Sequence, residues 1–240
     1  MRRSLALGLV APCCLAAACG SAGPNFGSLN GKTASEVLAL TTTAISTERF
    51  SFHFVDQSRV GTKTTTLTGE DTAAGSYQVL SGSGSALEVE QRADKSLYVR
   101  GAAGGLEGAL GLSTTAAAAD AGKWISLQPA DSPYKAVAAA LDPHQELYAF
   151  VPTAPYTLES PREFHGRTVV GVAGKAPILA VNGTGLVATV YVPTEPPYTP
   201  VGATLTFGTG VSAGVEAVVF SRWGQRTNPP APAGAVAYST

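Results

Sequence analysis

Apolar and polar side chains alternate along much of the chain with a period of two. An early segment shows this most clearly, with the order Phe50, Ser51, Phe52, His53, Phe54. The alternation resumes in three later segments, at residues 76–80, 86–92 and 96–101. Turn residues separate these segments, so the pattern predicts an antiparallel meander with one apolar face and one face exposed to water.

A helical period occurs in one segment ahead of these strands. Between residues 34 and 47, apolar and small side chains recur on one side of a helix, at Val37, Leu38, Thr41, Ala44 and Ile45. Thr33 and Glu36 have the spacing of a capping box, in which each side chain bonds the backbone N–H of the other residue. The pattern therefore predicts an amphipathic helix that begins after Thr33.

The middle of the chain is less regular. Residues 101–122 are mostly small and predict either a loop or a weak helix. Residues 124–127 predict a short strand. The tripeptide Asp-Ser-Pro at 131–133 predicts the start of a helix that runs to about Leu141, with its aspartate or serine as the N-cap and Pro133 at the first helical position. A second short helix is expected between residues 143 and 150.

The last third of the chain returns to strands. They are expected at about 156–159, 165–173, 186–192, 201–207 and 214–222. Asn182-Gly183 suits a tight hairpin, and residues 228–234 predict an extended segment. The order of helix, strands, helices and strands predicts one α+β domain, a single curved antiparallel sheet with helices on one face.

The first residues predict an export signal. Two arginines precede an apolar run that ends at Ala18 and is shorter than the roughly 20 residues of a membrane-spanning helix. Small residues then precede Cys19, in a pattern that resembles the bacterial lipobox, where a diacylglycerol is attached to the cysteine. We expect residues 1–18 to be a lipoprotein signal peptide, 19–32 a flexible tether and 33–240 one domain. The alternative is an ordinary signal peptide with incidental cysteines.

The composition argues against several classes of partner. Of 240 residues, 45% are apolar and 14% are charged, and the formal net charge is −1. Because no basic excess is present to neutralise phosphates, we expect no nucleic-acid partner. The three histidines lie far apart in the sequence, so we expect no metal site and no cofactor. We expect the protein to be a monomer.

One segment matches a catalytic motif by its letters alone. Residues 210–214 have the order G-x-S-x-G of a nucleophile elbow, which places a serine between a strand and a helix. Strands are expected on both sides here, and all three histidines precede Ser212, whereas the hydrolase order places the histidine after the serine. We therefore expect a hairpin turn and no enzymatic activity, and a hydrolase that uses Ser212 is the weakest alternative.

The apolar side of the predicted elements is the remaining candidate for function. One interpretation is an ordinary core. The other is that sheet and helices do not quite close and leave an apolar cavity for a lipid. Each methylene moved out of water gains about 0.8 kcal/mol, so an acyl chain of about sixteen carbons could gain roughly 12 kcal/mol without a polar contact. The candidate cavity residues are Phe50, Phe52, Phe54, Leu87, Val89, Leu97, Val99, Val137 and Leu141.

Several short stretches, in their order and spacing, resemble the LppX/LprAFG lipoproteins of mycobacteria and related actinobacteria. They are the lipobox at Cys19, TASEVLALTTTAI leading into RFSFHF, SLYVRG, GKW at 122–124, LDP at 141–143 and FSRWG at 220–224. The resemblance implies a half-barrel of antiparallel strands wrapped over helices, similar to the LolA and LolB lipoprotein carriers and to stress sensors of the RseB type. It also implies an apolar cavity for acylated lipids or glycolipids. Residues 101–122 depart from the family pattern.

Two functional hypotheses follow. The first is a lipoprotein anchored through Cys19 at the outer face of the cell membrane, which binds or shuttles an acylated lipid or glycolipid in its cavity. The second is a sensor or scaffold of the cell envelope with the same fold and no lipid cargo. A continuous apolar cavity favours the first, and a filled core favours the second.

Overall fold

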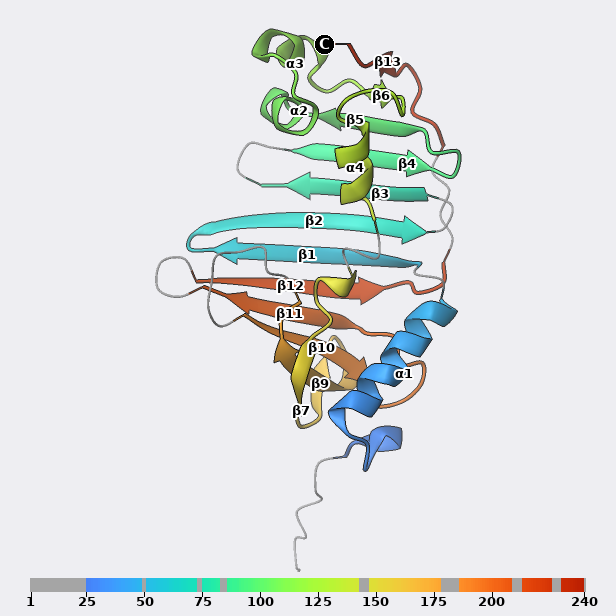
Figure 1. The fold of residues 1–240 in the computed structure, drawn as a ribbon, viewed down its shortest axis with the longest axis vertical. Helices are drawn as coiled ribbons and strands as arrows, with labels where there is room; N and C mark the ends of the chain where they lie inside the picture. Colours follow the sequence, from blue (N-terminus) through green and yellow to red (C-terminus); the bar gives the residue numbers. More distant parts are fainter. Residues whose placement is uncertain are drawn as a thin grey trace, which may run out of the picture.

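One large open antiparallel sheet and four α-helices make up the part of the chain that the structure describes (Figure 1). This computed structural model describes residues 25–48, 51–72, 75–82, 86–142, 147–177, 186–208, 213–225 and 230–239. The α+β class that the sequence predicts is confirmed at this level. The predicted turn at Asn182-Gly183, Ser212 and the start of the helix expected at 143–150 lie outside the described residues.

Along the described chain, runs of strands are separated by short helices, and a longer helix precedes the first strand. The helices are a 3₁₀ turn (Gly27–Leu29), α1 (Ala34–Thr47), α2 (Ala103–Leu110), α3 (Thr114–Asp120) and α4 (Tyr134–Ala140). The first strands are β1 (Phe52–Val60), β2 (Lys63–Thr72), β3 (Gly75–Ser81), β4 (Leu87–Arg92), β5 (Leu97–Gly101) and β6 (Ile125–Leu127). The later strands are β7 (Thr153–Leu158), β8 (Arg162–Phe164), β9 (Arg167–Lys175), β10 (Val187–Pro193), β11 (Gly202–Phe207), β12 (Gly214–Ser221) and β13 (Val236–Ala237).

Strand β1 lies in the middle of the sheet and joins two meanders. On one side β2 to β6 follow in chain order, and on the other side come β12, β11, β10, β9 and β7 (Figure 1). Among the described strands, the pairs are antiparallel except at one edge, where β13 runs parallel to β6. The sequence analysis was wrong in expecting a wholly antiparallel sheet, because a two-residue strand has no alternation pattern to detect.

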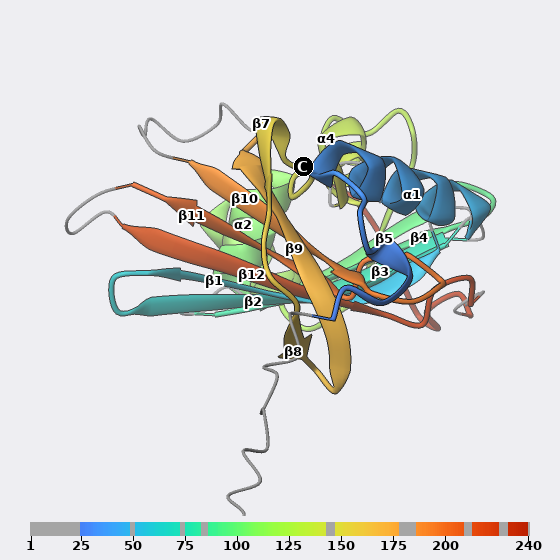
Figure 2. The ribbon, with the colours of Figure 1, turned by 90° about the horizontal axis from the view of Figure 1, so that it is seen from below.

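Two hydrophobic cores lie on one face of the sheet, which we call the inner face. The first packs α1 against β1 and β9 to β12, and includes Phe52 and Phe54. The second packs α2, α3 and α4 against β4 to β6, and includes Leu97 and Val99. Figure 2 shows α1 and α4 on the same side of the sheet, with β9 and β10 turned steeply against β1 and β2. This turn is the accumulated twist of neighbouring strands.

Helix α1 forms as its sequence predicts. The Thr33 backbone N–H donates to Glu36 Oε2 at 2.7 Å, and the Glu36 N–H donates to Thr33 Oγ1 at 3.3 Å, which completes the capping box. Val37 and Ile45 are buried on the helix face that meets the first core. The cap therefore fixes where the helix begins, and the apolar side chains fix which face it turns to the sheet.

The later helices depart in part from the expectation. Residues 101–122 form α2 and α3, so the weak-helix alternative is confirmed. Helix α4 begins at Tyr134, and Pro133 takes the N-cap position without a side-chain cap, so the prediction of Pro133 as the first helical residue is wrong by one position. The expected cap by Asp131 or Ser132 is wrong, because the Asp131 carboxylate instead accepts a hydrogen bond from the Gln128 N–H at 2.6 Å.

Part of the expected tether is docked on the domain. Leu29 is fully buried in the first core. The Ser28 N–H donates to the Thr194 carbonyl oxygen at 3.1 Å, and the Ser28 hydroxyl donates to the same oxygen at 2.7 Å. Residues 27–29 are therefore held against the chain near residue 194, and a flexible tether would have to end before them.

Phe54 packs across the sheet on a glycine of the next strand. The two residues are opposite each other in the pairing of β1 with β2. A Cβ atom added to Gly69 would overlap the Phe54 ring and would lie 3.0 Å from Gln78 Cγ. The missing side chain of Gly69 therefore makes room for a fully buried aromatic ring.

Replacing Gly69 with alanine should therefore lower the free energy of unfolding by about 1–3 kcal/mol, the usual cost of overpacking. Urea denaturation measures the effect. The matched control is Gly108→Ala in α2, where an added Cβ meets nothing within 4 Å. That control should be neutral or more stable by up to about 1 kcal/mol. Equal stability of Gly69→Ala and the native chain would contradict this packing.

Candidate ligand-binding groove

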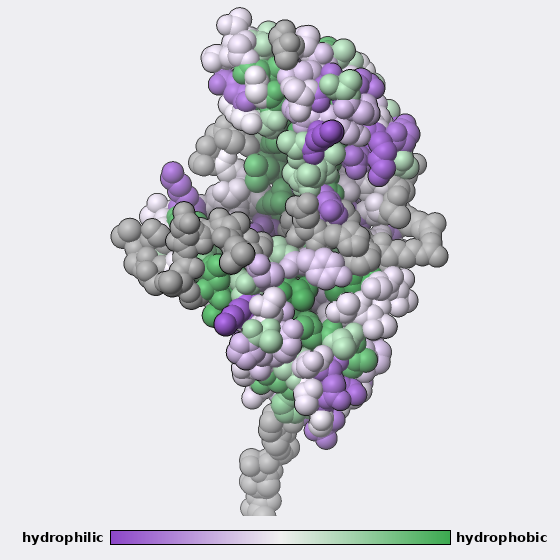
Figure 3. Space-filling view, viewed as in Figure 1, coloured by the Kyte–Doolittle hydropathy of each residue, from purple (hydrophilic) through white to green (hydrophobic). Residues whose placement is uncertain are grey.

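A groove crosses the inner face between the two cores. Its volume is about 430 Å³, within the range of about 300–1,000 Å³ typical of ligand sites. Strands β2, β3 and β4 form its floor, with Leu67, Gln78, Leu80, Leu87 and Val89. Helices α2 and α4 form its walls, with Gly108, Ala109, Ala136, Val137, Ala140 and Leu141. Figure 3 shows a hollow with hydrophobic side chains at its floor over the middle of the molecule.

Strand register gathers the leucines of the floor. Leu67 is opposite Leu80 in the pairing of β2 with β3, and Leu80 is opposite Leu87 in the pairing of β3 with β4. Directly opposite residues of antiparallel strands point to the same face, so the three side chains form one apolar row. Gln78 and Val89 are opposite each other in the next inward-facing row.

Small residues in the helices keep the groove open. Gly108 and Ala109 on α2, and Ala136 and Ala140 on α4, face it where larger side chains would fill it. A Cβ atom added to Gly108 meets nothing within 4 Å. The small-residue stretch after residue 101 thus helps to form one wall of the space.

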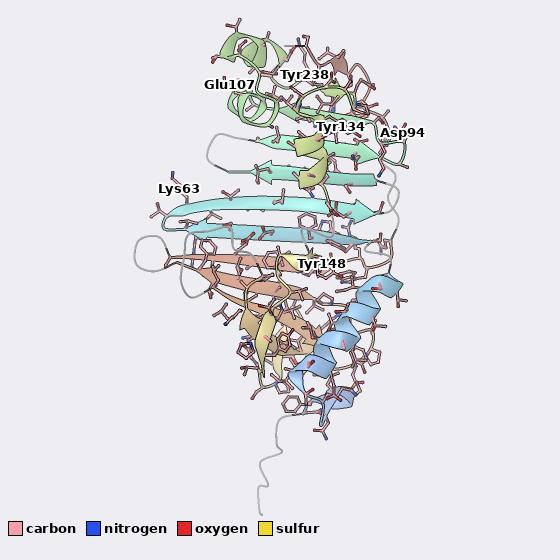
Figure 4. All side chains as sticks on the ribbon, in the orientation of Figure 1. Lys63, Asp94, Glu107, Tyr134, Tyr148 and Tyr238 are labelled. Atoms are coloured by element: carbon pink, nitrogen blue, oxygen red, sulfur yellow. The ribbon has the colours of Figure 1, made fainter. Side chains whose placement is uncertain are left out.

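Two tyrosine hydroxyls tie the walls to the rest of the fold (Figure 4). Tyr134, at the start of α4, donates to the Lys95 carbonyl oxygen at 2.7 Å. Tyr238, just after β13, donates to the Leu110 carbonyl oxygen at 3.1 Å. These bonds attach α4 to the β4–β5 turn and the end of α2 to the C-terminal segment, so both walls are held at defined positions.

The predicted cavity residues fall into three groups. Leu87, Val89, Val137 and Leu141 line the groove. Phe52, Phe54, Leu97 and Val99 are at most 2% exposed and pack inside the two cores. Phe50 and Cys19 lie outside the described residues.

Sequence analysis missed the other residues of the groove. It did not select Gln78 and Leu80, which lie in a segment it had assigned to a strand, or Leu67, which lies outside the assigned segments, because the pairing register that brings them together is not visible in a single strand. It also missed the small helical residues of the walls, Gly108, Ala109, Ala136 and Ala140. For these the available signal was the run of small residues itself.

A buried polar cluster lies beside the groove. Asp71 on β2 is fully buried and is opposite Ser76 on β3. Burial raises the pKa of the Asp71 carboxyl to about 7, and the charge of Asp142, just after α4, acts in the same direction. The side chains of Ser76 and Gln78 lower this pKa. Within the described part of the chain, neither Asp71 oxygen makes a hydrogen bond of ordinary geometry.

A second pocket, of about 440 Å³, lies around Trp223 and has a different character. Its lining includes Glu48, Arg167 and Arg222. Arg222 forms an ion pair with Glu70 at 2.7 Å. Because charged groups interrupt its walls, this pocket offers no continuous apolar surface to a hydrocarbon chain. Across the described ranges, no group of three or more His, Cys, Asp or Glu side chains is placed to hold a metal ion.

The fold and the groove together define an α+β protein with a large open sheet and an apolar groove between that sheet and its helices. None of the helices in the described ranges combines the length and apolar character needed to cross a bilayer. No protein-family model matches the sequence. No curated protein matches it either.

Several solved structures are similar to this chain at a low level. An uncharacterised conserved protein from Thermus thermophilus is 12% identical, with a TM-score of 0.41, over 85% of this chain and 98% of that chain. MucB in complex with MucA is 12% identical, with a TM-score of 0.39, over 83% of this chain and 58% of that chain. An outer membrane lipoprotein-sorting domain from Vibrio parahaemolyticus is 7% identical, with a TM-score of 0.30, over 79% of this chain and 92% of that chain. Similarity at this level assigns no family, so membership of the LppX/LprAFG family stays a prediction.

The buried Asp71 carboxyl predicts a specific pH dependence of stability. Between about pH 4 and pH 7 the folded chain keeps this proton, whereas the unfolded chain, with the ordinary pKa of 3.8, has lost it. The free energy of unfolding therefore falls as the pH rises through this window, by up to about 1.4 kcal/mol per unit, and the loss is complete above pH 7.

Asp71→Asn removes this contribution. Relative to the native chain, the variant should gain stability steadily from pH 4 to pH 7 and change no further above that. Urea unfolding of both chains at pH 4.5, 6 and 8 measures the difference. A difference that stays constant across the three pH values would show that Asp71 is not buried as a neutral acid.

Proposed function

We propose that this protein is an exported lipoprotein that binds or shuttles an acylated lipid or glycolipid, with an acyl chain in the groove between the sheet, α2 and α4. A diacylglyceryl group on Cys19 would anchor it at the outer face of the cell membrane. The groove carries the proposal, because Gln78 is the one polar side chain among the described residues that line its volume of about 430 Å³. The proposed role is binding, with no catalytic step.

The apolar lining of the groove suits a hydrocarbon chain. About twelve methylenes moved from water into the groove would gain roughly 10 kcal/mol. Association costs about 4–15 kcal/mol in lost freedom of motion. An acyl chain alone would thus bind weakly, and a further contact would be needed to raise both affinity and specificity.

The proposal also includes the family of the protein and the half-barrel shape of its sheet. Membership of the LppX/LprAFG family and a LolA-like half-barrel are supported by the ordered sequence stretches from TASEV to FSRWG. Helices α1 to α4 packed on the inner face are compatible with that shape. The lipid-modified Cys19 is supported by the small residues before it. Two acyl chains on such an anchor would hold the protein stably on a bilayer.

A sensor or scaffold of the cell envelope is the second candidate. One observation favours it. Val187 on β10 and Val215 on β12 are 45% and 36% exposed on the outer face, and both are opposite Thr206 of β11. A partner protein could cover this small apolar row. This function would not depend on the groove, so a variant with a filled groove separates the two candidates.

The test is the lipid content of the purified full-length chain. Organic extraction followed by mass spectrometry detects noncovalently bound lipid, while a lipid attached to cysteine stays on the protein. We expect acyl lipid to copurify with the native chain. Gly108→Leu should lower its amount several-fold, because Gly108 lines the groove and a Cβ atom added there meets nothing within 4 Å, so the larger side chain has room to enter the groove.

Ala139→Leu is the matched control, since Ala139 is an exposed residue of α4 that does not line the groove. It should leave the lipid content unchanged. A native chain that carries no lipid and takes up none from vesicles would contradict the proposal. Equal loss in both variants would also contradict it, because the loss would not come from the groove.

A further inference from the structure

Gln78 interrupts an otherwise apolar groove. Its side chain is 6% exposed, and it lines the floor beside Val89. Within the described part of the chain, its amide nitrogen Nε2 has no hydrogen-bond partner. A buried donor without an acceptor is destabilising, so such groups in native proteins usually have a partner or a function.

In the described surroundings of Gln78, Asp71 is the side-chain acceptor with which a ligand would compete. Phe54 and Gly69 lie on one side of it and Val89 on the other, and none of these offers a side-chain acceptor. Asp71 is an acidic side chain in its surroundings, and Gln78 lowers the pKa of Asp71, but their contact lacks the geometry of an ordinary hydrogen bond. Burial raises the pKa of Asp71 to about 7, so near neutral pH its carboxyl is only about half ionised and is a weakened acceptor.

The chemistry of the free atom defines the ligand group. An N–H donor needs an acceptor, and a carbonyl oxygen provides one. A free carboxylate would also accept, but it would bring a negative charge into an apolar site near Asp71 and Asp142. A neutral ester or amide carbonyl meets the need without that cost.

The position of Gln78 suits such a group at one end of an acyl chain. The leucine row of Leu67, Leu80 and Leu87 lies two residues along the strands from Gln78. Two residues of strand span roughly 7 Å. A carbonyl at Gln78 would therefore leave the adjoining methylenes against the leucines.

We propose that Gln78 donates a hydrogen bond to an ester or amide carbonyl of the ligand, so that the groove selects esterified or amide-linked acyl chains over bare hydrocarbons. This inference rests on the proposed function, because it names the class of lipid that the same groove accepts. Gln78 is then the residue that determines specificity, while the apolar row supplies most of the contact area.

Displacement of a fluorescent apolar dye from the full-length chain tests the inference. Methyl decanoate and dodecane serve as the competing ligands, since they have similar length and only the ester has an acceptor. The measured quantity is the ratio of their dissociation constants. Gln78→Met, which keeps the length of the side chain and removes its donor, should shift this ratio about ten-fold against the ester.

A control and a second variant complete the experiment. Gln91→Leu changes a glutamine of the same face that pairs with Ser76 and does not line the groove, so the ratio should stay at its native value. Gln78→Leu also lacks the donor and should weaken ester binding even if Gln78→Met folds poorly.

The outcomes separate this inference from the proposed function. An unchanged ratio in both Gln78 variants would overturn the role of Gln78 and leave the groove function standing. Failure of both ligands to displace the dye from the native chain would overturn the groove function, and the inference with it.

Discussion

Burial of one face of a very wide sheet is the constraint on which the rest of the structure depends. In the part of the chain that the structure describes, thirteen strands join into one sheet, and the helices cover its inner face toward the two ends. Helix α1 closes one core, and α2 to α4 close the other. The middle strands β2 and β3 lie between these cores, and the groove is the space that short helices rich in alanine and glycine leave there.

Much of the fold could be predicted from the sequence, because it follows from local patterns. Alternation at Phe52 and Phe54 identified β1, and the Thr33–Glu36 pair identified the start of α1. Features that depend on distant partners could not be found this way. Strand β13 exists because Val236 meets Ile125, and the docked residues 27–29 are held near Thr194.

The candidate site was less predictable than the fold. Four of the predicted residues line the groove, but Leu97 and Val99, on the same face, are fully buried. Alternation shows which face a side chain occupies and not whether a helix covers it. The polar residues Gln78 and Asp71 were not predicted because the expected lipid site was apolar. Their burial, which Asp56, Ser76 and Glu90 of the same sheet share, depends on the packing of distant elements and is not visible in the sequence.

Photo-cross-linking with a phospholipid that carries a diazirine in its acyl chain tests the central claim most directly. The full-length chain is mixed with vesicles of this lipid, irradiated and digested. Cross-links are expected in the peptides that contain the groove floor and walls, at residues 78–89, 103–110 and 134–141. Cross-links confined to the outer face around Val187 and Val215, or none above background, would contradict the assignment of the groove as the lipid site.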